Sequence, residues 1–162
     1  MHILFPLSRL QLSQEATRRN IDNSIPASLI KNAEALSQFL GTLNQAVYQE
    51  FGVSMTTSSI FRCPLLNTAV GGAKLSEHTE CRAADTEAPS VRPYDLALFY
   101  QKWLTGNEIE FNQIILEFGA WVHVSIPEFG KKGKQQTLTA VKTALPNGIR
   151  QTNYLNGLKD IK

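Results

Sequence analysis

Two of the three histidines in the chain lie near residues that could share a metal ion with them. His78 precedes Asp85 by seven residues, and His123 lies further on, in the segment Trp121-Val122-His123-Val124-Ser125. Two imidazoles and one carboxylate are a common ligand set for catalytic zinc, because three protein ligands leave a fourth position for water. Zinc lowers the pKa of that water to about 7, which makes hydroxide available at neutral pH. The spacing alone leaves a second interpretation open, in which both histidines are half-buried and satisfied by ordinary hydrogen bonds.

The helices that must position these residues are indicated by apolar periodicity. A long helix is predicted between Pro26, which suits a first helical turn, and Gly52, which suits a helix end. Its apolar residues recur at alternating steps of four and three: Leu29, Ala33, Leu36, Leu40, Leu43 and Val47. A second helix is predicted from Pro93 to Gly106, and a short helical turn from Ser13 to Arg19.

Strand signals come mainly in the second half of the chain. The predicted strands are rich in β-branched or apolar residues and cover Val53–Ser58, Gln113–Glu117, Trp121–Ser125 and Thr137–Val141. Phe118-Gly119-Ala120 is typical of a hairpin connection. Early helices and late strands with short links favour an α+β fold, with an antiparallel sheet packed against helices. No repeat or linker divides the chain, so we expect residues 1–162 to form a single domain.

Composition limits the classes of partner. The 162 residues are 43% hydrophobic and 19% charged, which is ordinary for a globular protein, and the formal net charge of +2 is too weak to indicate a nucleic-acid partner. No stretch approaches the roughly 20 apolar residues of a membrane span. The N-terminus has no leading basic residue, and Pro6 interrupts its apolar run, so we expect no secretory signal and synthesis in the cytoplasm.

The segments Ser76-x-His78, Ala83-x-Asp85 and Trp121-x-His123 resemble the zinc-binding signature of the D-Ala-D-Ala carboxypeptidase family of metallopeptidases. The resemblance is greatest to the short branch often encoded by bacteriophages as lytic enzymes. Other motifs follow the family order: Ala16-Thr17-Arg18, Ile21-Asp22-Asn23, Phe61-Arg62, Asn67, Val70-Gly71-Gly72, Gln113-Ile114-Ile115-Leu116-Glu117 and Leu138-Thr139-Ala140. The resemblance therefore covers nearly the whole chain, and it implies a hedgehog/D-Ala-D-Ala-peptidase-like fold.

The resemblance also implies roles for individual residues. His78, Asp85 and His123 would bind Zn2+, and Arg62 would steady the substrate carbonyl or the developing oxyanion. Family members place an acidic residue three positions before the last histidine ligand, where this chain has Ala120. Glu117 is the nearest acid upstream and the candidate general base.

Several of these assignments stay open at this stage. Whether Glu117 faces the metal depends on the loop after it; Glu77 and Glu80 are the alternatives, and an ordinary edge-strand carboxylate is the competing interpretation of Glu117. Arg62 could instead form a surface salt bridge. Ser76 and Trp121 are expected near the substrate, Ser76 as a hydrogen-bonding partner and Trp121 because it lies two residues from a ligand.

Two cysteines complete the set of reactive residues. Cys81 stands where the family usually has glycine, and it is tolerated if the backbone angle there is not strictly positive. Cys63 directly follows Arg62, so both thiols are expected near the site. Two reduced, partly buried thiols are the preferred interpretation, with a disulfide formed after export or a thiol near the zinc as the alternatives.

The resulting hypothesis is a zinc metallopeptidase that hydrolyses amide bonds in the peptide stems or cross-links of bacterial peptidoglycan, as a phage endolysin does. It would be made in the host cytoplasm, act on the cell wall as a monomer and need another factor to cross the membrane. One alternative is a D,D-carboxypeptidase that removes terminal D-Ala. Another is a non-catalytic, zinc-stabilised wall-binding or virion protein. The missing acid at Ala120 favours this last alternative, whereas the three retained ligands and Arg62 argue against it.

Overall fold

The computed structural model describes residues 5–146 and 148–161 of the chain. Its helices, including two 3-10 helices labelled η, and its strands follow one another in this order: α1 (Leu7–Leu10), α2 (Gln14–Arg18), η1 (Ala27–Leu29), α3 (Ile30–Phe51), β1 (Thr56–Ser59), α4 (Pro64–Ala69), η2 (Glu77–Glu80), β2 (Ala83–Glu87), α5 (Pro93–Gly106), β3 (Gln113–Glu117), β4 (Trp121–Ser125), β5 (Gln136–Ala144) and β6 (Arg150–Asn156). None of the helices in this part of the chain is both long and apolar enough to span a membrane.

The strands form one sheet in the order β1-β2-β4-β3-β5-β6. The predicted α+β class is confirmed, and four of the five strand pairings are antiparallel as expected. The pairing of β3 with β5 is parallel, so the sheet is mixed. The strand β4 ends beside the start of β3. The loop over residues 126–135 stays at this end of the sheet, so β5 also begins beside the start of β3 and runs in the same direction.

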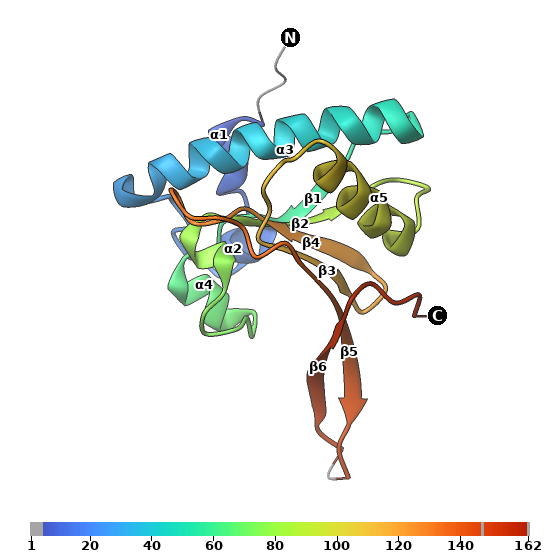
Figure 1. Cartoon of the computed structure of the whole chain (residues 1–162). Helices are drawn as coiled ribbons and strands as arrows, with labels where there is room; N and C mark the ends of the chain where they lie inside the picture. Colours follow the sequence, from blue (N-terminus) through green and yellow to red (C-terminus); the bar gives the residue numbers. More distant parts are fainter. Residues whose placement is uncertain (1–4, 147, 162) are drawn as a thin grey trace.

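One face of the sheet is covered by α3 and α5 (Figure 1). Alternate strand residues point into this core, because successive side chains of a strand lie on opposite faces. The sheet contributes Ala84, Ile114, Leu116, Val122 and Val124, and the helices contribute Leu36, Leu40, Leu43, Leu96, Tyr100 and Leu104. Complete burial of such a side chain stabilises the fold by about 1.5–3 kcal/mol.

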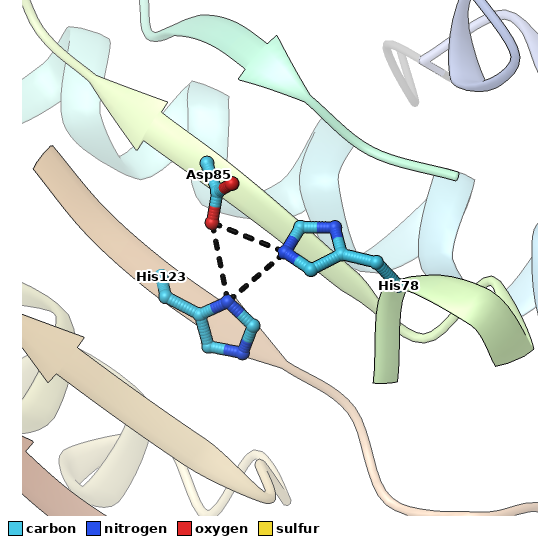
Figure 2. A group of neighbouring side chains, drawn as sticks. All are labelled: His78, Asp85 and His123. Atoms are coloured by element: carbon cyan, nitrogen blue, oxygen red, sulfur yellow. Dashed lines mark hydrogen bonds and ion pairs between the residues drawn. The ribbon is translucent and has the colours of Figure 1, made fainter. Parts of the chain in front are cut away.

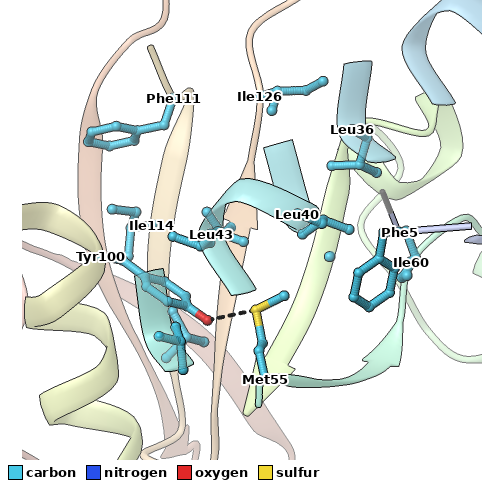
Figure 3. Packing of buried hydrophobic residues seen from close by; sticks show 14 of the residues in the cluster. Phe5, Leu36, Leu40, Leu43, Met55, Ile60, Tyr100, Phe111, Ile114 and Ile126 are labelled. Carbon is cyan, nitrogen blue, oxygen red and sulfur yellow. Dashed lines mark hydrogen bonds between the residues drawn. The ribbon is translucent and has the colours of Figure 1, made fainter. Parts of the chain in front are cut away.

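Tyr100 is buried in this core, and its hydroxyl is not left without partners. It donates to the sulfur of Met55 at 3.0 Å (Figure 3), and it lies 3.1 Å from the hydroxyl of Thr86. Burial raises the pKa of Tyr100, so the phenol stays neutral. The apolar stripe predicted for the long helix therefore packs on the sheet, and the helix ends at Gly52 in a left-handed conformation, as its sequence indicates.

Element boundaries agree with the sequence in most places. The strands Gln113–Glu117 and Trp121–Ser125 are found with the predicted bounds, and the second helix runs from Pro93 to Gly106 as predicted. The first strand begins at Thr56 and not at Val53, because the amide of Met55 donates to the side chain of Asn44 at 2.7 Å instead of to a strand.

Candidate metal centre

Three side chains converge on the face of the sheet that α3 and α5 leave uncovered. Asp85 on β2 and His123 on β4 are directly opposite each other in the sheet, and His78 in η2 approaches them from the side (Figure 2). Nε2 of His78 is 3.1 Å from Oδ1 of Asp85 and 3.2 Å from Nδ1 of His123, and the third distance, between Nδ1 of His123 and Oδ1 of Asp85, is 3.2 Å. All three residues are buried.

The hydrogen bonds around the cluster determine which nitrogen of His78 can bind a metal. Nδ1 of His78 is 2.5 Å from the carbonyl oxygen of Ile60 and must donate its proton there, because a carbonyl only accepts. Nε2 therefore presents a lone pair toward Asp85 and His123. On the other side of the cluster, Nε2 of His123 faces the carboxylate of Glu77 at 3.9 Å, which leaves Nδ1 of His123 toward the centre.

This arrangement fits a metal ion. Bonds of about 2.0–2.1 Å in a tetrahedral zinc site place neighbouring ligand atoms roughly 3.3–3.4 Å apart, close to the distances between these atoms. Three converging lone pairs repel one another unless a cation or a proton lies between them. Imidazole nitrogens with one carboxylate oxygen suit zinc among the common metals, so the residues present fit the group that they would hold.

The ionisation of the three residues reflects the same crowding. Burial lowers the pKa of His78 and outweighs the opposing effect of Asp85. Burial also opposes a charge on His123, but Asp85 and Glu77 outweigh it and raise the pKa of His123 to about 9. The pKa of Asp85 is held well below its usual range because the two histidines outweigh the effect of burial. Without a metal, the cluster therefore holds a proton on His123 at neutral pH.

The position of Glu77 against the ring of His123 was not predicted from the sequence, which indicated Glu77 only as an alternative general base. Nη1 of Arg82 donates to its Oε1 at 3.2 Å, and Asn112 donates to the same oxygen. Its Oε2 is buried, has no hydrogen-bond partner in the described part of the chain and points at Nε2 of His123. Burial alone would raise the pKa of Glu77, but His123, the nearby hydroxyl of Ser125 and the charge of Arg82 lower it to about 2. Such an ionised carboxylate orients a histidine for metal binding.

Glu117 lies on the same face of the sheet as His123. The loop Phe118-Gly119-Ala120 makes Glu117 the direct partner of Trp121, two residues before His123 on β4. With a loop of two residues, Glu117 would pair with Ala120 instead of Trp121. Its side chain would then lie on the helix-covered face, because side chains alternate along a strand. Burial raises the pKa of Glu117, and the charge of Asp85 raises it further. Ala120, at the family position of the acid, is exposed at the turn.

Arg62 lies beside the cluster, next to the second oxygen of Asp85. Its Nη2 is 3.6 Å from Oδ2 of Asp85, and its Nε is buried without a hydrogen-bond partner among the described residues. The residue also lines a groove of about 930 Å3 that runs along β1, α2 and α4. The guanidinium is therefore paired with Asp85 inside the site and not at the surface, and the residue lies between the cluster and the groove.

The other predicted residues are placed less centrally. Trp121 lies on β4 beside Glu117, with its ring centroid 5.6 Å from that of Phe118. Ser76 precedes η2, and its side chain makes no capping hydrogen bond; its carbonyl accepts from the amide of Thr79 at 3.0 Å. Both are near ligands in the chain, but neither is part of the cluster itself.

The two cysteines are unpaired in the structure. Cys81 ends η2 with φ 53° and ψ 43°, a left-handed conformation that turns the chain into β2. The condition under which cysteine was expected to replace glycine without strain is therefore not met, because the angle is positive. Cys81 is nonetheless buried in the core, and burial raises the pKa of its thiol to about 12, so it remains a protonated thiol.

The α+β fold thus carries a buried cluster of two histidines and one aspartate that could hold a metal ion. The sequence profile of the peptidase M15 family matches residues 4–125, and the chain belongs to this family of metallopeptidases. No curated protein sequence matches the chain. The family match ends at Ser125, the last residue of β4, so β5 and β6 lie beyond it.

Proposed function

We propose that the protein is a zinc metallopeptidase that hydrolyses amide bonds in the peptide stems or cross-links of bacterial peptidoglycan. The observation that carries the proposal is the convergence of the three lone pairs of His78, Asp85 and His123, with Glu117 on the same face of the sheet. Membership of the M15 family supports peptide hydrolysis, and the resemblance to D-Ala-D-Ala carboxypeptidases supports the wall as substrate.

Nε2 of His78, Oδ1 of Asp85 and Nδ1 of His123 would hold the metal. Zinc, when bound there, supplies Lewis acidity toward the scissile carbonyl and toward water. Glu77 keeps His123 in the orientation that this requires, and Ile60 does the same for His78 through its carbonyl.

Glu117 acts as the general base in this proposal. It takes a proton from the attacking water as the oxygen of that water bonds to the scissile carbon. It then returns the proton to the nitrogen as the carbon–nitrogen bond breaks. A group that both accepts and returns a proton works best when its pKa is moved toward the working pH, and the raised pKa of Glu117 is a shift in that direction.

Arg62 stabilises negative charge on the carbonyl oxygen. Its position beside Asp85 and at the groove lets its guanidinium donate to an oxyanion that exists only in the transition state. Ser76 and Trp121 contribute to substrate binding at the edges of the site. The protein acts as a monomer, and a lytic role like that of a phage endolysin is part of the proposal. Removal of a terminal D-Ala is the alternative reaction for the same groups.

The test is mass spectrometry of fragments released from purified sacculi. Wild-type protein, chelator-treated protein and Glu117→Gln are compared, with Glu34→Ala as the control, because Glu34 is an exposed acid on α3. New amine termini, or loss of D-alanine, are expected with wild type and Glu34→Ala only. Release of fragments by Glu117→Gln at the wild-type rate would refute the assignment of the base. No release by any form, with zinc bound, would show that the fold serves for binding.

A further inference from the structure

The β5–β6 hairpin extends the sheet face that carries the metal cluster, and it lies outside the family match. Register places four residues in one row across the sheet, Trp121, Glu117, Ala140 and Tyr154, from β4 to β6. Direct partners in a sheet have their side chains on the same face. The hairpin projects from the body of the protein on the side away from α3 (Figure 1). It therefore forms a wall beside Glu117.

Tyr154 is the part of this wall nearest to Glu117. Only the small side chain of Ala140 separates the two residues in their row, and Ala140 is fully buried. Burial raises the pKa of Tyr154, and the charge of Glu117 raises it further. Tyr154 is nevertheless 53% exposed, so the residue presents a surface to solvent beside the proposed base.

Lys142 stands on the same face, two residues beyond Ala140 on β5. Its Nζ is 4.9 Å from the ring centroid of Phe118, which in turn packs edge-on against Trp121. The lysine is exposed and has no acidic partner in an ion pair within the described ranges. The sequence contains no Asp or Glu from Phe129 to Lys159. This wall is therefore positively charged, with an ammonium held over an aromatic ring and free to meet an anion.

The position of Glu117 gives the direction in which a substrate would lie. A base that returns its proton to the leaving amine must be close to that amine, so the part of the substrate after the scissile bond lies on the side of Glu117 and the hairpin. The part before the bond then lies toward Arg62 and the groove along β1. Lys142 lies on the side of Glu117 and the hairpin, so the leaving group is the part of the substrate that meets it.

We propose that Lys142 binds a carboxylate in the leaving-group part of the substrate, with Tyr154 and Phe118 as the walls of this subsite. The inference rests on the proposed peptidase function and names the substrate chemistry that the hairpin selects. Two residues along β5 span about 6.8 Å, and an extended substrate advances about 3.3–3.6 Å per residue. The carboxylate therefore belongs to the first or second residue after the scissile bond.

The probes for the test are the synthetic stem pentapeptide L-alanyl-γ-D-glutamyl-L-lysyl-D-alanyl-D-alanine and its fully amidated form. Hydrolysis is followed by mass spectrometry, and binding to the zinc-loaded protein is followed by calorimetry. Wild type is expected to prefer the free acid by about tenfold, as one charge-assisted contact in a partly exposed site allows. Lys142→Ala should reduce this preference to about one and leave the amidated peptide unaffected. Lys142→Arg should keep most of the preference.

Lys102→Ala is the matched control, because Lys102 is an exposed lysine on α5, across the sheet from the site. It should behave as wild type. An acid-to-amide ratio in Lys142→Ala equal to that of wild type would overturn the inference, and so would the absence of a preference in wild type. A preference in binding that depends on Lys142, without hydrolysis of either peptide or of sacculi, would support the subsite and refute the peptidase function.

Discussion

Replacement of Glu77 by glutamine tests whether this carboxylate stabilises the metal centre through His123. Its Oε2 is 3.9 Å from Nε2 of His123, the nitrogen that carries the proton when Nδ1 faces a metal, so the carboxylate orients the ring and attracts the positive charge that a metal places on it. Glutamine still offers an oxygen to the ring but lacks this charge. Partners of histidine ligands typically change metal affinity by 10- to 100-fold, about 1.4–2.7 kcal/mol. We expect a loss of zinc affinity in this range.

The assay is competition for zinc with a chromophoric chelator at pH 7.5. Glu80→Gln is the matched control, because Glu80 also pairs with Arg82 but does not contact His123. It should bind zinc within about twofold of wild type, since the carboxylate that it changes is exposed and turned away from the cluster. Zinc affinity of Glu77→Gln equal to that of Glu80→Gln would refute the reasoning, because the buried charge would then contribute nothing to the ligand that it faces.

Three further predictions concern the site and its surroundings. Metal-free protein should lose about 3 kcal/mol of stability in urea titrations as the pH rises from 6.5 through about 9. The reason is that the raised pKa of His123 stabilises the folded state only while the ring is protonated. Unchanged stability over this range would mean that the ring is neutral. Glu117→Gln should lower kcat by about 10²–10⁴ with zinc affinity within about threefold of wild type, and a parallel loss of zinc would show a structural role instead. Cys81→Gly should be more stable than Cys81→Ala by about 1 kcal/mol in chemical denaturation, because glycine relieves the left-handed conformation; the reverse order would show that the angle is not strained.

Much of the local structure follows from the sequence. The long helix is readable because Leu36, Leu40 and Leu43 repeat at helical spacing, and Gly52 ends it through its freedom at positive φ. The strands β3 and β4 are readable because their branched and aromatic residues disfavour helix. The ligand set was available through the resemblance of the three short motifs around His78, Asp85 and His123, and the structure brings all three together.

Two strands were missed for a common reason. The sequence of β2, Ala83–Glu87, has little strand propensity of its own, and it is extended because β1 and β4 pair with it on both sides. The strand β6, Arg150–Asn156, is mostly polar and is held by its pairing with β5. In both cases the hydrogen bonds of neighbouring strands override weak local preference, and such neighbours are distant in the sequence.

The chain by itself determined which residues could bind a metal and which segments are helix or strand, because these depend on side-chain chemistry and on short-range periodicity. Only the tertiary structure decided which face of the sheet each residue occupies. The length of the turn after Glu117 sets that residue on the same face as His123, and hydrogen bonds from Arg82 and Asn112 hold Glu77 toward Nε2 of the same ring. The parallel pairing of β5 brings Lys142 and Tyr154 to the site. Register and packing are sums over contacts between segments far apart in the chain, so no local pattern carries them.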